Sequence, residues 1–215
     1  MRSGTLRAVC VVGAVAMMAA GGAQGAMLGL TQEPPDITSG FIQVDYDAVN
    51  DTFTASGFSL SFDIDGKDPP DYGNILGAFD ITATIDATGT ASDGSLTIGG
   101  TIPALGATSG TLLTGNLTAF GFDEPDLPNK PYPTIFEFVF DVTGGDLTSY
   151  FPIGTPAGTI LDAKGWQTGS EFAGGFSAGF SNNGTGVADT FVPEPATLAL
   201  LACGGGLLAL RRRRR

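Results

Sequence analysis

Histidine is absent from this 215-residue sequence, and its only two cysteines, Cys10 and Cys203, lie in apolar segments near the two ends. The region between them therefore offers no imidazole and no thiol. This excludes zinc sites built on Cys and His, Cys-His proteases, haem or iron–sulfur ligation by these residues, and triads with a histidine base. A disulfide within that region is excluded as well, so its stability must come from packing, hydrogen bonding or a bound ion.

Positive charge is scarce in the middle of the chain. Residues 27–192 hold three lysines and no arginine against 21 carboxylates, a net charge of −18, whereas seven arginines lie at the two ends. Such a surface repels phosphate backbones, so we expect no nucleic-acid partner. The same polyanionic character predicts that divalent cations stabilise the domain by relieving self-repulsion.

Length and composition fit one folded domain with its own core. Charged residues make up only 15% of the chain, while 33 glycines accompany a hydrophobic fraction of 42%. These proportions argue against both a charge-rich disordered chain and a collagen, and they favour a Gly-rich, apolar, extracellular protein.

Stretches in which apolar residues alternate with Thr, Ser and Asp predict β-strands. The clearest is 134–142, where every second residue from Phe136 to Phe140 is Phe. A hairpin is expected from 41–46 and 52–60 around a turn at 47–51. Further strands are predicted at 77–86, 95–102, 111–122, 170–181 and 186–192. The pattern indicates an all-β domain, either an antiparallel β-sandwich or a barrel-like sheet, and the sequence leaves that choice open.

Residues 1–26 have the three-part order of a secretory signal peptide. Arg2 and Arg7 precede an apolar run at 8–20, and small residues follow at 21–26. The run is too short for the roughly 20 apolar residues of a membrane-spanning helix, so we predict export with cleavage between positions 23 and 26. The all-β extracellular domain then spans 27–191.

The segment 192–215 contains three parts in a fixed order. Pro193, Glu194 and Pro195 form an extended and accessible tripeptide, because two prolines prevent regular helix or strand pairing. An apolar stretch at 196–210 would span about 22 Å as a helix, short of the roughly 30 Å hydrocarbon core. The arginines that follow mark the cytoplasmic side of a membrane. They are Arg211, Arg212, Arg213, Arg214 and Arg215.

This tail resembles the PEP-CTERM sorting signal of exopolysaccharide-producing Gram-negative bacteria. Pro193, Glu194 and Pro195 match the motif that names the signal, and the apolar helix and arginine cluster match its other parts, over 24 of 215 residues. The run at 203–206 departs slightly from the usual Leu/Gly/Ala mixture. The resemblance implies two partners, the export machinery and an exosortase-like processing enzyme. It implies a precursor held transiently at the inner membrane, cut near the tripeptide, and delivered to the cell surface or extracellular matrix.

The resemblance concerns sorting and leaves the activity of the domain open. We expect a non-enzymatic domain with a structural or adhesive role. The alternative is a carbohydrate-binding module for exopolysaccharide, in which an exposed Trp166 or Tyr72 would stack on a sugar ring. Trp166 is the only tryptophan, and packing against the core is the competing interpretation of a lone aromatic residue.

Calcium is the one cofactor that the sequence suggests. Asp63, Asp65, Asp68 and Asp71 supply the oxygen ligands that calcium prefers. The loop begins like an EF-hand, but Lys67 occupies the third ligand position and no Glu follows at the twelfth. A calcium loop of another type is one interpretation, and a solvated turn with Asp side chains capping backbone amides is the other. The acidic loop at 123–129 has the same ambiguity.

Two patterns raise the question of hydrolysis. Ser177 lies in a G-x-S-x-G sequence, which is typical of a nucleophile elbow, but the chain has no histidine to act as base. Glycosidases need only two carboxylates, and Glu137 and Glu171 lie on predicted strands from which they could face one cleft. Their spacing does not single them out among the other carboxylates, so the expectation of a non-enzymatic domain stands.

Overall fold

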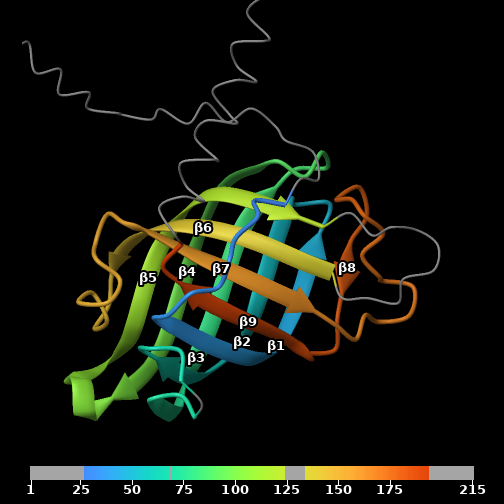
Figure 1. The fold of residues 1–215 in the computed structure, drawn as a ribbon. Coiled ribbons are helices and arrows are strands. Elements are labelled where there is room, and N and C mark those ends of the chain that lie inside the picture. Colours follow the sequence, from blue (N-terminus) through green and yellow to red (C-terminus); the bar gives the residue numbers. More distant parts are fainter. Residues whose placement is uncertain (1–26, 68, 124–133, 194–215) are drawn as a thin grey trace, which may run out of the picture.

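The computed structural model describes residues 27–67, 69–123 and 134–193. Those residues form nine strands and one short 3-10 helix, η1 (Pro103–Leu105) (Figure 1). The strands are β1 (Asp36–Asp47), β2 (Thr52–Asp63), β3 (Tyr72–Ile85), β4 (Ala91–Ile102), β5 (Ala107–Phe122), β6 (Thr134–Gly144), β7 (Pro156–Ala163), β8 (Phe180–Ser181) and β9 (Gly186–Phe191).

Eight of these strands close into an antiparallel barrel. Strands β1 to β6 each pair with the next strand along the chain, β7 pairs with β9, and β9 pairs with β1 to complete the ring. The two residues of β8 lie outside the ring and pair with Asp45 and Tyr46 of β1. The predicted all-β class is therefore confirmed, and the choice left open between sandwich and barrel is decided in favour of the barrel.

Most predicted strands are confirmed, and several are longer than predicted. The stretch 134–142 is β6, and its phenylalanines Phe136, Phe138 and Phe140 are all fully buried. The predicted hairpin is β1 and β2, joined through a turn in which the Asp47 carboxylate accepts the Val49 backbone N–H at 2.8 Å. Side chains from opposite walls meet inside the barrel, so its interior is a packed core.

The loop between β7 and β8 closes one end of the barrel, and the strand predicted at 170–181 is wrong. Only Phe180 and Ser181 pair as a strand. Gly169 and Gly174 adopt φ angles of 82° and 84°, which break the extended backbone. Aromatic side chains of the loop turn into the barrel instead, as Phe172 does with its ring centroid 5.2 Å from that of Phe136.

A second loop, between β6 and β7, covers the opposite end. Its residues Leu147 and Phe151 are buried, and the Tyr150 ring meets the Phe62 ring edge-on at 5.2 Å. Both ends of the barrel are thus closed by aromatic and aliphatic side chains, which leaves the outer surface as the place for interactions.

Strand β7 is missing from the sequence-based prediction. It begins with Pro156 and contains Gly158, and both residue types are unfavourable inside strands. Pro156 is tolerated as the first residue of the strand. Gly158 has a different role, because a side chain there would crowd other parts of the chain, as described below.

Both predicted targeting segments fall largely outside the described residues. This applies to residues 1–26, to Glu194 and Pro195, and to the stretch from 196 through Arg211–Arg215. Asp68 is also outside them. Within the part of the chain that the structure describes, no helix has the length and apolar character needed to cross a bilayer.

Candidate functional site

The segment 27–35, here called the strap, crosses the outer face of β9, β7 and β6 before it enters β1 (Figure 1). Glu137 of β6 holds it there. The two carboxylate oxygens of Glu137 accept the backbone N–H groups of Gly29 at 2.8 Å and Leu30 at 3.1 Å. The Glu137 side chain is buried, with only 2% of its surface exposed, although it points away from the barrel core. Burial raises the pKa of Glu137, and the backbone hydrogen bonds from the strap partly offset this effect.

Gly158 is the point where the two ends of the domain meet. A Cβ placed on Gly158 would lie 3.1 Å from Cγ of Pro193, 3.2 Å from the Phe191 ring and 3.3 Å from Cδ1 of Leu30. Gly158 pairs with Phe191 of β9 on one side and with Val139 of β6 on the other. Phe191 and Val139 are both buried. The strap and the residues that follow β9 thus cover one apolar area on the outside of the barrel.

Pro193 is buried in the structure. The sequence-based expectation of an accessible motif is therefore wrong for its first residue. The physical reason is the missing side chain of Gly158, which leaves room for the Pro193 ring beside β7. Proline rings are apolar enough to gain from such a contact. Glu194 and Pro195 lie beyond the described residues.

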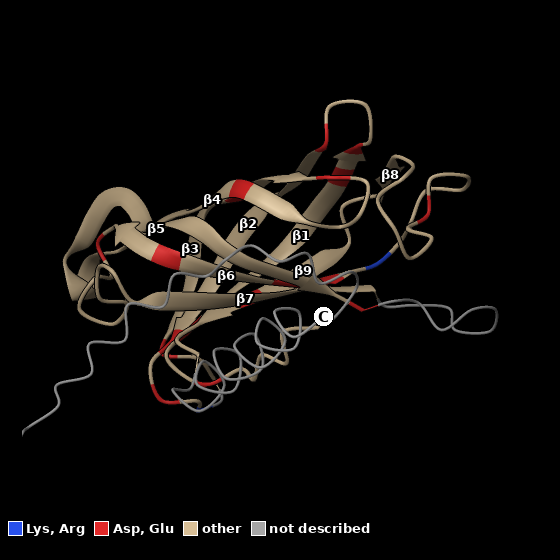
Figure 2. Ribbon diagram, turned by 90° about the horizontal axis from the view of Figure 1, so that it is seen from above, with Lys and Arg blue, Asp and Glu red and all other residues tan. Residues whose placement is uncertain are grey.

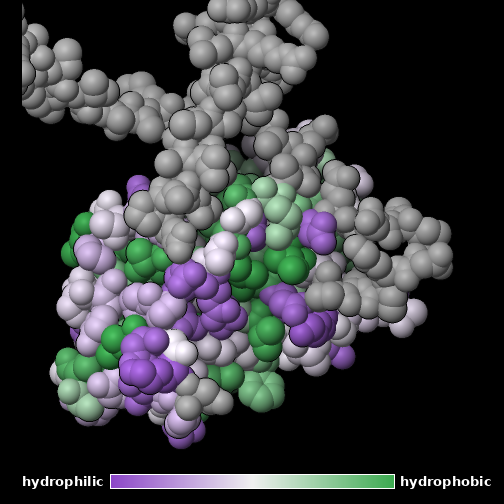
Figure 3. Space-filling view, viewed as in Figure 1, coloured by the Kyte–Doolittle hydropathy of each residue, from purple (hydrophilic) through white to green (hydrophobic). Residues whose placement is uncertain are grey.

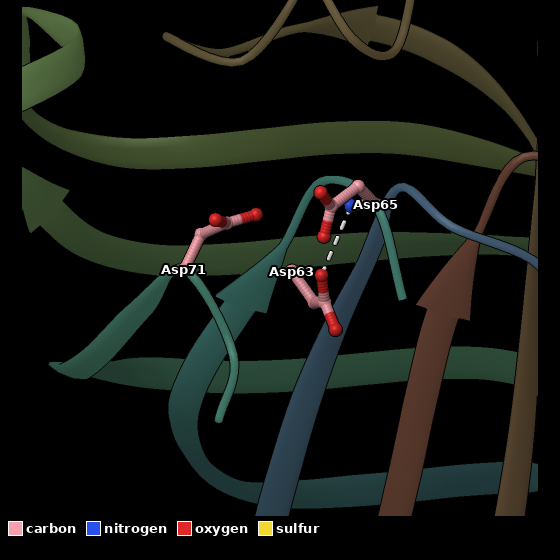
Figure 4. A group of neighbouring side chains, drawn as sticks. All are labelled: Asp63, Asp65 and Asp71. Carbon is pink, nitrogen blue, oxygen red and sulfur yellow. Dashed lines mark hydrogen bonds between the residues drawn. The ribbon is translucent and has the colours of Figure 1, made fainter. Parts of the chain in front are cut away.

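Three of the four predicted calcium ligands come together in the loop after β2 (Figure 4). One carboxylate oxygen from each of Asp63, Asp65 and Asp71 lies within 4.8 Å of the others. The Asp63 carboxylate accepts the backbone N–H groups of Asp65 at 3.0 Å and Gly66 at 2.9 Å. The turn-capping role predicted as the alternative is therefore present, and it leaves the second oxygen of Asp63 available.

Lys67 forms an ion pair with Asp65 inside the same loop. The Asp71 carboxylate accepts the Ile64 backbone N–H at 2.9 Å. Calcium takes six to eight oxygen ligands, so an ion here would need water or backbone carbonyls beside these carboxylates, and the Lys67 ammonium would have to move. Calcium binding by Asp63, Asp65, Asp68 and Asp71 stays a prediction.

A shallow hollow of about 370 Å³ lies beside this loop, between the strap and β2. Asp36 and Asp63 line it from paired positions on β1 and β2. Burial raises the pKa of Asp36, the Gln32 amide partly offsets this, and nearby Asp189 and Asp63 raise it further. Burial also raises the pKa of Asp189. Carboxylates thus gather at this end of β1, β2 and β9, and acidic residues far outnumber basic ones over the described part of the ribbon (Figure 2).

The aromatic residues predicted for sugar stacking are only half exposed. Trp166 packs against the core, with its ring centroid 5.6 Å from Phe180 and 6.4 Å from Phe172. Tyr72 stacks on Phe62 at 6.2 Å. Ligand binding at Trp166 stays a prediction, while the alternative interpretation, packing against the core, matches this geometry.

Two other aromatic side chains face solvent instead. Phe41 is 69% exposed and Phe58 is 56% exposed. Phe58 of β2 lies between Gly40 of β1 and Ala78 of β3, whose small side chains leave its ring uncovered. Phe41 occupies a β-bulge of β1 with a φ of 54°, a backbone conformation that costs energy for a residue with a side chain. Hydrophobic residues are exposed between hydrophilic ones on the barrel face in Figure 3.

Hydrogen-bonding side chains lie next to Phe58 on the same outer face. In the adjacent row, Ser56 pairs with Gln43 on β1 and with Asp80 on β3. The sequence carried a signal for this arrangement, since Phe58 interrupts the polar series Thr52, Thr54, Ser56 on the outward-facing positions of its strand. No comparable sequence pattern predicts the strap or its contact with Glu137.

The residues considered for hydrolysis do not assemble into a recognisable site. Ser177 is exposed in the loop that closes the barrel. Both oxygens of Glu137 are occupied by the strap, while Glu171 is exposed and accepts the Gly169 backbone N–H at 2.9 Å. Neither glutamate lines the hollow beside β2 or a second hollow over β3, β4 and β5.

Comparison of the chain with family models, with curated proteins and with solved structures finds no match.

Proposed function

We propose that this chain is an exported protein of the cell surface or extracellular matrix, sorted through its tail at 192–215. In this proposal Pro193, Glu194 and Pro195 form a PEP-CTERM motif that an exosortase-like enzyme processes, and Arg211–Arg215 retain the precursor at the inner membrane. The mature barrel has a structural or adhesive role.

The observation that carries this proposal is the meeting of the two ends of the domain at Gly158. Leu30 and Pro193 both lie within contact distance of that residue. Leu30 follows the predicted signal peptide by four residues, and Pro193 precedes the predicted apolar helix by three. A domain whose ends leave from one place suits a precursor that is held against one membrane by both terminal segments.

The properties of the barrel also favour an extracellular role. Its interior is filled, its stability needs no disulfide or thiol, and its acidic surface keeps the domain soluble. Interactions with a matrix would then take place on the outside of the strands.

The experiment that tests the proposal is the intact mass of the protein recovered from its native host, with peptide mapping of both ends. We expect a chain that begins near Met27 and ends near Pro193 to Pro195. Excess mass would reveal an attached group. A chain that still ends at Arg215 would overturn the sorting proposal.

A second candidate function, binding of exopolysaccharide, is favoured by the exposed rings of Phe41 and Phe58. Sugars combine an apolar ring face with hydroxyl groups, and Phe58 lies beside Ser56, Asp80 and Gln43. The acidic surface favours a neutral or amino-sugar polymer over an anionic one. Calcium bound by the Asp63 loop is a further part of this candidate function.

Binding of the purified domain to neutral, amino-sugar and uronic-acid polysaccharides would test it. We expect Phe58→Ala to weaken binding of a neutral or amino-sugar polymer by about tenfold, the value of one good stacking contact. Val49→Ala is the matched control, because Val49 is 91% exposed in the β1–β2 turn. Equal binding by both variants would remove this candidate function.

A further inference from the structure

We propose that the hollow over β3, β4 and β5 binds one sugar unit of a neutral polysaccharide, and that Leu76 and Phe58 hold the same polymer beside this hollow. The inference rests on the second candidate function, polysaccharide binding, and adds to it the place where a sugar unit is held. It also narrows the ligand from neutral or amino-sugar polymers to neutral ones.

The hollow has a volume of about 390 Å³ and an uncharged lining. Thr97, Thr101 and Thr111 bring hydroxyl groups to it, and Leu76 and Ala78 bring apolar side chains. None of its lining residues in the described part of the chain is charged, although residues 27–192 hold 21 carboxylates. The hollow beside β2, by contrast, is lined by aspartates and a lysine. A charged ligand would lose water in the second hollow without gaining a counter-charge, whereas a neutral sugar uses both the hydroxyl groups and the apolar side chains.

A buried hydroxyl group fixes the backbone at this hollow. Gly77 of β3 and Gly99 of β4 line the hollow from neighbouring strands. The Gly77 N–H donates to Oγ of Ser59 at 3.0 Å, and this hydroxyl donates to the Gly99 carbonyl at 2.7 Å. Ser59 is fully buried. Because Gly77 and Gly99 have no side chain and are held in place by Ser59, a ligand meets a preorganised backbone surface.

Leu76 is held toward solvent by a strained backbone. It belongs to a bulge in which residues 74–76 of β3 lie opposite Leu60 alone, since Ser59 pairs with Gly77 and Ser61 pairs with Gly73. Leu76 has a φ of 43° and is 72% exposed. A left-handed backbone costs energy for a bulky residue, and the exposed side chain gains no burial within the fold to offset that cost. Strain of this kind is typical of binding sites, so it points to a contact outside the domain.

Phe58 extends the apolar surface to the next strand. It is 56% exposed and pairs with Ala78, which lines the hollow. Side chains at paired positions lie side by side on one face of a sheet, so the Phe58 ring lies next to the hollow. One polymer chain can therefore contact Leu76, the threonines of the hollow and Phe58 together.

Net charge favours a neutral polysaccharide over the other occupants of such a surface. A second copy of the domain would bring a further net charge of −18 from residues 27–192, and an anionic polymer would meet the same repulsion. A neutral polysaccharide meets no such repulsion. It presents apolar ring faces to Leu76 and Phe58 and hydroxyl groups to the threonines.

Calorimetric titration of the full chain with a soluble neutral glucan, mannan and galactan, in a detergent without sugar groups, tests the inference. Leu76→Gly is the informative variant, because glycine adopts the left-handed backbone without strain. We expect its affinity for the neutral polymer to fall by about tenfold with no decrease in the unfolding midpoint. Asn74→Gly is the matched control, since Asn74 has a φ of 59° in the same bulge and does not line the hollow. Its affinity should equal that of the unmodified chain.

A second pair of variants tests the hollow itself. Ala78→Glu places a carboxylate at the uncharged lining, and we expect it to weaken binding of the neutral polymer by more than about tenfold. Thr82→Glu adds the same charge at an exposed position of the same strand, away from the hollow, and should leave the affinity unchanged.

The outcomes separate this inference from the candidate function on which it rests. Neutral-polymer binding that survives both Leu76→Gly and Ala78→Glu would overturn the hollow as the site and leave polysaccharide binding elsewhere on the barrel intact. Binding of chitosan alone, lost in about 0.5 M sodium chloride, would also overturn the inference, because it would report surface carboxylates. If Leu76→Gly lowers the unfolding midpoint, Leu76 serves the fold, and Ala78→Glu decides. Failure of the unmodified chain to bind any of these polymers would remove the candidate function as well.

Discussion

Asn182 completes the hydrogen bonding of Val44 across 138 positions of sequence: its side-chain oxygen accepts the Val44 backbone N–H at 2.8 Å. The side-chain NH₂ of Asn182 donates to the Ile42 carbonyl at 3.2 Å, and the same oxygen accepts the Gly184 N–H. Asn182 is fully buried. It thus takes the place of a strand residue beside β1, between the pairings that β1 makes with β8 and β9.

Asn182→Ala should therefore destabilise the barrel by about 2–4 kcal/mol, because buried backbone groups of Ile42 and Val44 lose their partners. Chemical denaturation of the domain measures this loss. Asn183→Ala is the control, since its side chain is exposed and accepts only the Thr185 hydroxyl. Comparable losses in the two variants would contradict the role assigned to Asn182.

Gly77 marks a close approach of β3 to β4, and replacing it should be costly. A Cβ at this position would lie only about 2.0 Å from the backbone of Gly99, a separation that no rearrangement of side chains relieves. We expect Gly77→Ala to cost about 3 kcal/mol or more, as overpacked sites do. Gly73→Ala lies in the same strand with no neighbour within 4 Å and should change the free energy of unfolding by about 0.5 kcal/mol or less. Similar unfolding midpoints for the two variants would rule out the close approach.

The strands could be predicted from the sequence where the alternation is local. Phe136, Phe138 and Phe140 show the inward face of β6 without any knowledge of its neighbours. The loop that contains Phe172 and Phe176 has equally strong aromatic character, but its glycines with positive φ end the extended backbone. Aromatic residues that close a barrel end and aromatic residues on a strand therefore look alike in sequence.

Closure of the barrel and the meeting of its two ends at Gly158 depend on long-range contacts. The ring closes where β9 pairs with β1, about 150 positions earlier, and Leu30 and Pro193 approach Gly158 from segments separated by a similar distance in sequence. No local pattern encodes such a meeting. The acidic loop after β2 could be predicted in part. Asp63 and Asp65 are close in sequence, whereas the position of Asp71 depends on where β3 begins.

Stability should be greatest at mildly acidic pH. Burial raises the pKa values of Glu137, Asp36 and Asp189 in the folded protein. Groups of this kind bind a proton more readily in the folded state, so their contribution is complete below the usual carboxyl range and is lost as pH rises through their raised pKa values. The excess of negative charge acts in the same direction, since it grows with pH.

Three turn carboxylates set the acid limit of this optimum. Hydrogen bonds lower the pKa values of Asp47, through Asn50, of Asp86, through Thr88, and of Asp146, through the Ser109 backbone N–H. Their contribution is present above the usual carboxyl range and disappears as pH falls through their lowered pKa values. We expect the unfolding temperature to peak near about pH 5 and to fall toward both pH 8 and pH 3.

Asp189→Asn tests why the unfolding temperature falls as the pH rises above the optimum. The neutral amide keeps the shape of the side chain and removes its titration, so the fall in unfolding temperature between about pH 5 and pH 8 should become shallower. Asp93→Asn, at an exposed position of β4, removes the same formal charge and serves as the control. Identical slopes in the two variants would assign the pH dependence to net charge alone.

Calcium should stabilise the domain more than magnesium if the Asp63 loop binds it. Extracellular calcium sites have dissociation constants of about 0.1–1 mM, so 10 mM calcium would add about 1.4–2.7 kcal/mol to the free energy of unfolding by mass action. Magnesium dehydrates reluctantly and prefers octahedral geometry, which an irregular loop with Asp63, Asp65 and Asp71 does not offer. Unfolding midpoints in calcium chloride, magnesium chloride and sodium chloride of matched ionic strength measure the difference.

The ion pair between Lys67 and Asp65 allows a test of whether calcium stabilises the domain through this loop. An ammonium group competes with calcium for the same carboxylate, so Lys67→Gln should enlarge the shift that calcium produces. Lys164→Gln changes the net charge equally but acts on Asp162 of β7, and it should leave the calcium shift unchanged. Equal midpoints in the three salts would mean that the aspartates only cap the turn. Equal calcium shifts in the two variants would mean the same, because general relief of self-repulsion does not distinguish the two lysines.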